Sequence, residues 1–335
     1  MSRPVEKEPA ASLAGTAGAA AGPPAHGLQA ALAAGRFVVT TELSMPDSAD
    51  PAEILRRARM LDGWVDAINT TDSSGANVHV SSVAASAVLA RAGYSPIMQI
   101  TCRDRNRIAI QSDVLGAAML GVGAVLCLTG DRVEAGDHPG AKPVFDLDSL
   151  TLIDTVRQMR DRGRYISGRA IAAPPRMLIG AAENPFAPPV DWRPLRLKQK
   201  IDAGAQFIQT QFCYEVPMLE AFMARARDMG LDRRAGIIVG VGPLASAKTA
   251  RWLRGNVAGV HVPDAVIKRL EQAKDQAAEG RKICVELMQE IRCVPGVAGV
   301  HLMAFRQEKF TAEIIRASGI LGGQRPTPVA AVSGA

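Results

Sequence analysis

The chain has 335 residues, of which 47% are hydrophobic and 21% are charged, as in globular proteins with one large or two small domains. Its five cysteines are far apart and form no CxxC pair, which argues against a zinc site or a disulfide framework and fits a reducing, cytoplasmic compartment. The net charge of +6 suits the binding of anionic small molecules. The sequence has no long basic block, which argues against nucleic-acid binding. It also has no apolar span of ~20 residues and no signal-peptide pattern, which argues against membrane insertion and export.

Both ends of the chain differ in composition from its middle. Residues 1–30 are rich in Ala, Gly and Pro, and residues 323–335 have a similar composition. Segments of this kind bury little apolar surface, so we predict a disordered tail at each end. The composition does not shift between residues 31 and 322, which predicts a single domain.

Within that domain, short β-branched runs alternate with longer segments that have apolar residues three and four apart. The predicted strands are 37–44, 65–72, 95–102, 124–131, 176–183, 206–213, 235–242 and 297–305. The predicted helices are 51–63, 79–93, 106–121, 149–163, 194–205, 215–230 and 245–256, with further helices in 263–293. Several of these helices end at a glycine, such as Gly121.

Continuous apolar strands that alternate with helices are typical of a parallel sheet covered by helices. A count of eight strands favours a (β/α)8 TIM barrel over an open doubly wound sheet. The segment 263–293 adds helices before the last strand. The fold class is therefore predicted as α/β, with a single barrel.

In such a barrel the active site lies where the strands end. Glu42 closes the first strand. It is not needed as a helix cap, because Asp50, before Pro51, can cap the next helix. Asp131 closes the fourth strand too far from the next helix to cap it, whereas Asp148 is placed to do so. These positions make Glu42 and Asp131 candidates for catalysis. We expect Asp131 to point into the mouth of the barrel, and the loop 132–145 after it to lie over a ligand without regular structure.

The roles of other polar residues at the strand ends can each be interpreted in two ways. Asp72 could cap the following helix or face the site. Gln211 lies within an apolar strand, where an unpaired amide costs about 1–3 kcal/mol, so it is satisfied either by a ligand or by a buried partner. His301 is also in an apolar strand. A histidine in such a place is more often a core residue with its hydrogen bonds satisfied than a catalytic base. The histidines show no HxxxH spacing, and we expect no metal site.

The chain also lacks GxGxxG after a strand and GxxxxGK[ST], so neither a Rossmann nucleotide site nor a P-loop is indicated. It does contain, in order, the segments "TTEL", "DAINTTD", "QITCRDRN", "VLCLTGD", "GAAENPF" and "KQKIDAGAQFIQTQF". Together they resemble methylenetetrahydrofolate reductase over roughly residues 36–320. The phrasing around "CRDRNRIAIQSDVLGAAMLGVGAVLCLTGD" looks most like the branch from specialised one-carbon pathways.

The resemblance implies a cytoplasmic flavoprotein of folate one-carbon metabolism and methionine biosynthesis. Such a barrel passes a hydride from NAD(P)H through a flavin, FAD rather than FMN, and interconverts 5,10-methylenetetrahydrofolate and 5-methyltetrahydrofolate. Its partners would be tetrahydrofolate derivatives and NAD(P)H, together with a homo-oligomer or a partner subunit.

Residue by residue, the resemblance assigns the general acid to Glu42 and a contact with flavin and pterin to Asp131. It assigns the pterin contact in the sixth strand to Gln211. The expected flavin-binding positions are Thr71, Gln99, Thr129, Gly130, Asp131, Asn184 and Lys200. Of these, Lys200 is expected near the phosphate side of the flavin.

This chain departs from better-known bacterial members at one of these positions and at others near them. Gln99 stands where they have His, Gln199 where they have Arg, and Ala247 near an expected aromatic residue. These departures keep open a different flavin, or a member without one. The alternative function is a folate-binding methyltransferase or a corrinoid-linked partner subunit on the same barrel, without nicotinamide chemistry. A third alternative is a non-catalytic partner subunit.

Overall fold

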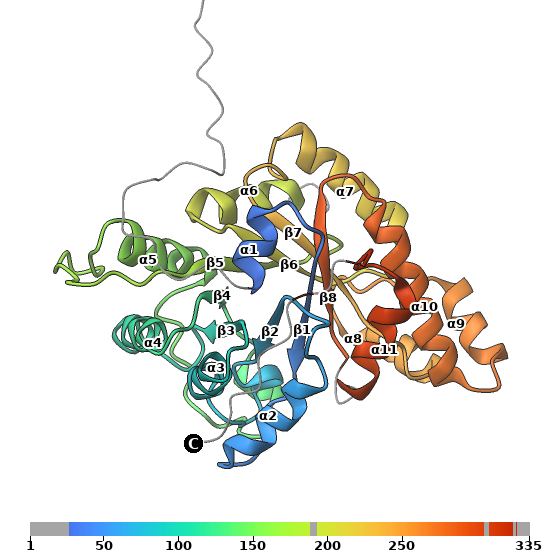
Figure 1. Cartoon of the computed structure of the whole chain (residues 1–335), viewed down its shortest axis with the longest axis horizontal. Coiled ribbons are helices and arrows are strands. Elements are labelled where there is room, and N and C mark those ends of the chain that lie inside the picture. The colour runs from blue at the N-terminus through green and yellow to red at the C-terminus, as the bar shows by residue number, and fades with distance from the viewer. Residues whose placement is uncertain (1–26, 188–192, 305–307, 324–325, 327–335) are drawn as a thin grey trace, which may run out of the picture.

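The computed structural model describes residues 27–187, 193–304, 308–323 and 326. Its eight parallel strands pair in chain order, and β8 closes the barrel against β1 (Figure 1). The strands are β1 (Val38–Leu43), β2 (Ala67–Thr70), β3 (Pro96–Thr101), β4 (Ala124–Leu128), β5 (Leu178–Glu183), β6 (Phe207–Phe212), β7 (Gly236–Val241) and β8 (Val297–Leu302). The predicted (β/α)8 barrel is confirmed.

Helices surround the barrel on its outside, and the first helix covers the end where the strands begin (Figure 1). They are α1 (Gly27–Ala33), α2 (Pro51–Arg59), α3 (Ser82–Arg91), α4 (Arg107–Met119), α5 (Ser149–Asp161), α6 (Arg193–Ala203), α7 (Val216–Asp228), α8 (Ala247–Asn256), α9 (Asp264–Gln272), α10 (Gln276–Arg292) and α11 (Glu308–Ser318). Two short 3₁₀ turns, η1 (Ser74–Ala76) and η2 (Val133–Ala135), lie in loops. Helices α9 and α10 are the ones predicted before the last strand.

The helix termini follow the predicted local chemistry. The side chain of Asp50 accepts a hydrogen bond from the Ala52 backbone N–H, at the start of α2. Asp148 caps α5 in a capping box with Thr151. Gly121 follows α4 with a φ of +88°, a left-handed conformation that glycine adopts at little cost.

The first helix begins within the segment that was predicted as the N-terminal tail. Helix α1 begins at Gly27, so residues 27–30 of the predicted tail are helical. Leu28 and Ala31 of α1 are buried because they pack into the apolar end of the barrel. Residues 1–26 and most of 323–335 lie outside the described residues.

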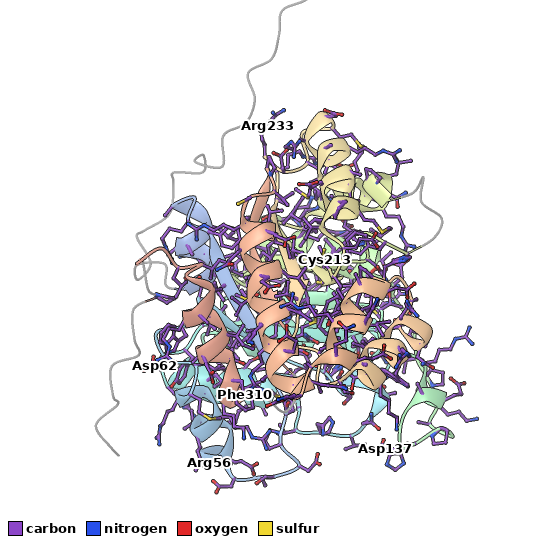
Figure 2. All side chains as sticks on the ribbon, turned by 90° about the vertical axis from the view of Figure 1, so that its right-hand side faces the viewer. Arg56, Asp62, Asp137, Cys213, Arg233 and Phe310 are labelled. Carbon is purple, nitrogen blue, oxygen red and sulfur yellow. The ribbon has the colours of Figure 1, made fainter. Side chains whose placement is uncertain are left out.

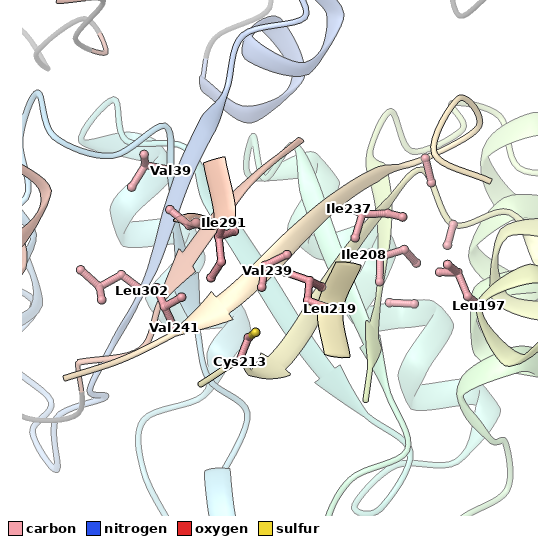
Figure 3. Packing of buried hydrophobic residues seen from close by; sticks show 14 of the residues in the cluster. Val39, Leu197, Ile208, Cys213, Leu219, Ile237, Val239, Val241, Ile291 and Leu302 are labelled. Atoms are coloured by element: carbon pink, nitrogen blue, oxygen red, sulfur yellow. The ribbon is translucent and has the colours of Figure 1, made fainter. Parts of the chain in front are cut away.

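The main hydrophobic core fills the layer between the strands and the helices (Figure 3). Val239 and Leu302 of the strands pack in this layer with Leu219 of α7 and Ile291 of α10, and all four are fully buried. This layer holds the helices to the barrel and leaves the alternate strand residues to fill its interior.

The two ends of the barrel interior differ in chemistry. At the end where the strands begin, the interior is apolar, and Phe207 is its largest side chain. A Cβ at Gly180 would lie only 2.2 Å from the Phe207 ring, so this ring needs a glycine on the neighbouring strand. At the opposite end the interior is polar and open. Among the described residues, no helix is long and apolar enough to cross a membrane.

Candidate active site

A cavity of about 390 Å³ opens where the strands end. Its position is that of active sites in barrels of this kind. The residues that line it are Glu42, Gln99, Leu126, Cys127, Leu128, Thr129, Ser149, Ala182, Glu183, Asn184, Ala187, Arg196, Lys200, Gln209, Thr210, Gln211, His301 and Met303. Six of the nine predicted site residues are therefore brought together: Glu42, Gln99, Thr129, Asn184, Lys200 and Gln211.

Glu42 lies on β1 and projects into this cavity, half-buried. None of the described residues donates a hydrogen bond to its carboxylate. Burial without a compensating partner disfavours the charged form, and it raises the pKa of Glu42 from 4.5 to about 7. A carboxyl group of this kind holds a proton near neutral pH and can give it to a bound molecule.

Two amides face the cavity with hydrogen-bonding capacity to spare. Gln211 accepts a hydrogen bond from the Phe212 backbone N–H at 3.0 Å through its Oε1, which leaves its amide N–H groups for a ligand. Gln99 is buried, and no described residue hydrogen-bonds its side chain. An amide that is buried without a protein partner indicates a place where a ligand supplies one.

Beneath them lies a layer of four buried polar residues, Thr40, Asn69, Gln209 and His301. Asn69 and Gln209 exchange hydrogen bonds of 2.6 and 3.1 Å across the barrel, and Thr40 Oγ1 lies 2.9 Å from His301 Nδ1. His301 is a buried interior residue, as expected, and its Nδ1 is hydrogen-bonded within this layer, whereas no described residue hydrogen-bonds its Nε2. The layer as a whole was missed, although Thr40 and Gln209 each lie two residues before a predicted site residue and so share its face of the strand.

One wall of the cavity is an ion pair that the sequence did not predict. Lys200 of α6 donates from its Nζ to Glu183 Oε2 at 2.8 Å and to the Ala182 carbonyl at 2.7 Å. Both charged side chains are buried. Lys200 was expected at the phosphate side of a flavin, and here its charge is already balanced by Glu183.

The charge that remains at this wall belongs to Arg196, one turn earlier on α6. Arg196 is exposed, and no described residue pairs with it. Next to it, Asn184 donates from its Nδ2 to the Ala258 carbonyl at 2.6 Å. Its Oδ1 is buried, and no described residue donates to it.

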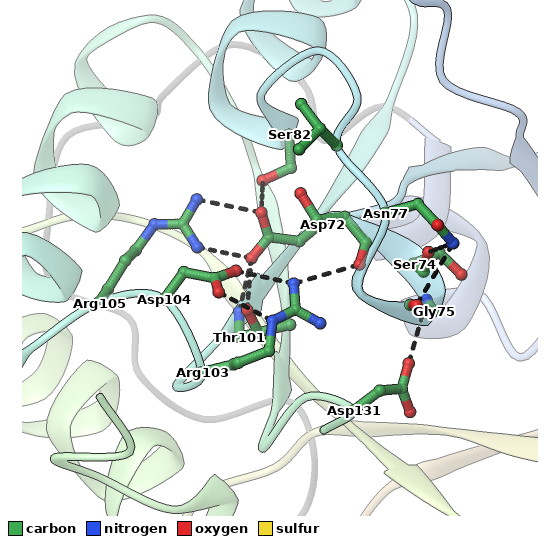
Figure 4. A network of polar contacts seen from close by, with 12 residues as sticks. Asp72, Ser74, Gly75, Asn77, Ser82, Thr101, Arg103, Asp104, Arg105 and Asp131 are labelled. Atoms are coloured by element: carbon green, nitrogen blue, oxygen red, sulfur yellow. Dashed lines mark hydrogen bonds and ion pairs between the residues drawn. The ribbon is translucent and has the colours of Figure 1, made fainter. Parts of the chain in front are cut away.

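The other three predicted residues, Thr71, Gly130 and Asp131, do not line this cavity. Thr71 is buried. The carboxylate of Asp131 is exposed and accepts a hydrogen bond at 3.1 Å from the Gly75 backbone N–H, in the loop after β2 (Figure 4). Asp131 was expected to point into the mouth, and its contact with flavin and pterin remains a prediction, because the bond to this neighbouring loop is the one that the structure shows.

The loop after β4 was predicted to lie over a ligand. The structure instead packs it against the loop after β2, where Asp137 accepts two bonds from the Val78 backbone N–H and a Cβ at Gly136 would lie 1.9 Å from the Ala76 carbonyl oxygen. Part of it forms η2, although no regular structure was predicted.

Figure 2 shows where this loop lies in the molecule: Asp137 is at one end, and Arg233, before β7, is at the other.

Asp72 hydrogen-bonds the end of β3. It neither caps the following helix nor lines the cavity, the two roles that were considered for it. Its carboxylate accepts hydrogen bonds from the backbone N–H and hydroxyl of Thr101 at 2.8 and 2.9 Å, and it pairs with Arg105 at 2.7 Å (Figure 4). It also contacts the Ser82 hydroxyl, but it does not cap the backbone of α3.

A second cavity of about 820 Å³ lies between α4, α5 and the loop before α5. Thr129 lines both cavities, and Gly130 lines the second one, so the two spaces adjoin at the end of β4. Gly130 has a φ of +97°, and a Cβ there would lie 3.0 Å from Thr101 and Arg103. Its charged lining residues are Arg132, the ion pair of Arg107 with Asp146, and Asp148 and Asp154. Among the described residues, no group of three His, Cys, Asp or Glu side chains could hold a metal ion.

Comparisons with known proteins agree with this geometry. Residues 27–319 match the family described as methylenetetrahydrofolate reductase. The "Probable methylenetetrahydrofolate reductase (NADPH)" of Caenorhabditis elegans is 26% identical over 255 residues, which are 74% of this chain and 36% of that protein. "Methylenetetrahydrofolate reductase 2" of Schizosaccharomyces pombe is 28% identical over 243 residues, which are 67% of this chain and 36% of that protein.

The chain therefore spans about a third of the length of these curated relatives. A solved structure of a Clostridium thermocellum protein, described as binding two copies of 5-methyl-5,6,7,8-tetrahydrofolic acid, shares the fold with a TM-score of 0.59 and 14% identity. That similarity covers 85% of this chain and 94% of the other. The match over residues 27–319 shows that the chain belongs to the methylenetetrahydrofolate reductase family.

Proposed function

We propose that this chain is a methylenetetrahydrofolate reductase that interconverts 5,10-methylenetetrahydrofolate and 5-methyltetrahydrofolate with NAD(P)H. The observation that carries the proposal is Glu42, a carboxyl group with a pKa of about 7 and no described hydrogen-bond donor, in the cavity of a barrel of this family. Opening the five-membered ring of the substrate requires a proton on a ring nitrogen. Glu42 is protonated near neutral pH and can donate it.

The cavity also offers what a pterin ring needs for orientation. Gln211 has free amide N–H groups, and Gln99 is buried with unused hydrogen-bonding groups. A ring with carbonyl and nitrogen acceptors would satisfy both. We propose that Gln211 holds the pterin and that Gln99 lies beside the flavin. The Clostridium thermocellum protein of the same fold is described as binding a reduced folate, which supports a folate ligand for this fold.

The residues present also fit a flavin, and we propose FAD rather than FMN. The cavity of about 390 Å³ adjoins the larger one of about 820 Å³ at Thr129, which leaves room for a ring system and an extended nucleotide. Gly130 has no side chain at this junction, and Arg132 and Arg196 can balance phosphate charge. When bound, the flavin supplies the hydride chemistry. Thr71, Thr129, Gly130, Asn184 and Lys200 remain proposed flavin contacts, and Asp131 a proposed contact of flavin and pterin.

The experiment that tests this function is performed on the full chain. The purified protein is expected to be yellow, to bleach anaerobically with NADH or NADPH, and to regain its colour when 5,10-methylenetetrahydrofolate is added. Comparing NADH with NADPH identifies the donor, and size-exclusion chromatography reports whether the chain forms an oligomer.

A colourless protein that oxidises neither nicotinamide, even after incubation with FAD or FMN, would overturn the flavin-dependent proposal. If such a protein still binds 5-methyltetrahydrofolate, the alternative of a folate-binding methyltransferase or corrinoid-linked subunit takes its place.

A further inference from the structure

The polar layer beneath the cavity has a consequence for His301. Barrel interiors of this kind are filled mainly by branched apolar side chains, whereas here Thr40, Asn69, Gln209 and His301 meet from four different strands. Each of the four side chains has a hydrogen-bond partner within the layer. A buried network of hydrogen bonds fixes the orientation of the side chains that form it.

The two amides set the direction of the hydrogen bonds. Asn69 Nδ2 donates to Gln209 Oε1 at 2.6 Å, and Gln209 Nε2 donates back to Asn69 Oδ1 at 3.1 Å. In this arrangement Gln209 Nε2 also faces Thr40 Oγ1 at 3.2 Å and His301 Nδ1 at 3.3 Å. An amide nitrogen only donates, and it has two hydrogens. One is directed to Asn69 Oδ1, and Thr40 Oγ1 and His301 Nδ1 share the other as acceptors.

His301 Nδ1 is therefore an acceptor. It lies 2.9 Å from Thr40 Oγ1, whose hydrogen can point to it because Thr40 Oγ1 itself accepts from Gln209. A neutral imidazole with an accepting Nδ1 carries its proton on Nε2. Burial lowers the pKa of the His301 imidazole to about 3, so the ring stays neutral at physiological pH.

The ring also has a defined place relative to Glu42. Thr40 and His301 are register partners on β1 and β8, and Glu42 lies two residues beyond Thr40 on the same face. Both Glu42 and His301 line the cavity of about 390 Å³. Since Nδ1 is occupied within the layer, Nε2 is the nitrogen left for the cavity, and none of the described residues hydrogen-bonds it.

We propose that His301 is a positioning residue, which donates its Nε2–H to a carbonyl or ring-nitrogen acceptor of the flat heterocycle bound above it. The layer of Thr40, Asn69 and Gln209 holds it in that single tautomer. This inference rests on the proposed function, because pterins and flavins are the heterocycles that the cavity would hold. The titratable groups that line the cavity with His301 are Glu42, Cys127, Arg196 and the ion pair of Glu183 with Lys200.

The first test needs no ligand and no activity. The chain contains five histidines, and ¹⁵N-histidine labelling of the wild-type protein with the His301→Gln variant for assignment reports the tautomer of each. We expect His301 to be neutral, protonated on Nε2, and free of titration between pH 5 and 8. A proton on Nδ1, or a titration of this ring in that range, would overturn the proposal.

The second test measures binding of 5-methyltetrahydrofolate and of the flavin by calorimetry. His301→Met removes the donor and is expected to weaken the ligand that His301 contacts about tenfold, the size of one neutral hydrogen bond. His301→Gln keeps an amide N–H near the position of Nε2 and is expected to change Kd less than about threefold. The ligand that responds, folate or flavin, is the one held by His301.

His79→Gln is the matched control, because His79 pairs with Asp47 and lines neither cavity. Equal affinities of wild type and His301→Met for both ligands would contradict the proposal. If His301→Met does not fold, the wild-type tautomer and the shift of its Nε2 signal on adding either ligand decide the question. If these tests give the expected results but the protein reduces no folate, the role of His301 stands and the proposed reductase function is wrong.

Discussion

The interior of the barrel is apolar at one end and polar at the other, although the same strands build both. On β1, Val38 belongs to the apolar end, while Thr40 and Glu42 follow it on the same face. On β6, Phe207 is succeeded in the same way by Gln209 and Gln211. Two residues along each strand are thus enough to pass from packing to hydrogen bonding.

The difference separates two tasks. The apolar end is covered by α1 and excludes water, so its side chains contribute to stability through burial. The polar end opens into the cavity and keeps groups whose hydrogen-bonding capacity no described residue uses. We expect substitutions at the apolar end to change stability and those at the polar end to change turnover or binding.

The largest expected effect is on catalysis at the polar end. Glu42→Gln keeps the shape of the side chain but removes the proton that the substrate nitrogen needs, so folate turnover should fall about 100- to 10,000-fold. NAD(P)H oxidation with an artificial acceptor should stay within about twofold of wild type, because that half-reaction needs no such proton. Steady-state kinetics with both acceptors measures this. Folate turnover close to wild type would exclude Glu42 as the acid.

The next largest effect is on stability at the apolar end. Phe207→Ala leaves a cavity against Gly180 and should lower the free energy of unfolding by about 3–5 kcal/mol. Denaturant unfolding measures it. The folded fraction should keep the Michaelis constant of wild type for folate. A variant that remains as stable as wild type but binds folate poorly would break the proposed division between the two ends.

The pH dependence of turnover follows from the pKa of Glu42, about 7. The acid is active when protonated, so folate turnover should be constant below about pH 7 and should fall about tenfold per pH unit above it. A profile with no fall between pH 7 and 9 would contradict the role of Glu42.

Stability should depend on the same group in a defined direction. The pKa is raised in the folded chain, from 4.5 to about 7, so between these values the unfolded chain releases a proton that the folded chain retains. Stability should therefore decrease as pH rises from 4.5 to 7 and then level off, by about 1–3 kcal/mol in total. Glu42→Gln should remove this decrease, so at pH 8 the variant should be more stable than wild type.

A smaller pair of effects concerns the loop after β4. Asp131→Asn removes the negative charge of the proposed contact with flavin and pterin, so folate turnover should fall about tenfold. Thermal stability should stay unchanged, because the bond to the Gly75 N–H is on the exposed surface. Asp148→Asn should change stability by less than about 0.5 kcal/mol, since Asn caps a helix nearly as well as Asp. Kinetics and thermal melts of both variants measure this. The same loss of turnover in both would mean that the loop, and not the Asp131 carboxylate, is responsible.

Much of the fold could be predicted from the sequence because it depends on local patterns. The apolar runs predicted all eight strands, and Asp50 and Asp148 were recognised as caps from their neighbours in sequence. The same reasoning found Glu42, since a carboxyl group left over at a strand end needs only the next few residues to be identified. The start of α1 was missed because its helix is short and is stabilised by packing into the barrel.

The partners of the site residues could not be predicted. Lys200 is balanced by Glu183, Asp131 reaches Gly75, and Gln209 meets Asn69 140 positions away. Such pairs depend on how the strands are staggered around the closed barrel and on how the loops pack, and no short segment encodes either.

The sequence by itself determined the order of strands and helices, the family, and the residues at the strand ends, because periodicity, capping and motifs are properties of neighbouring residues. Only the tertiary structure decided which of those residues share a cavity and which are already neutralised, and that Thr40, Asn69, Gln209 and His301 form one layer. Barrel closure brings β8 beside β1, so that Thr40 and His301, 261 positions apart, come within 2.9 Å. Contacts over such separations arise from the packing of the whole chain and are absent from any part of it.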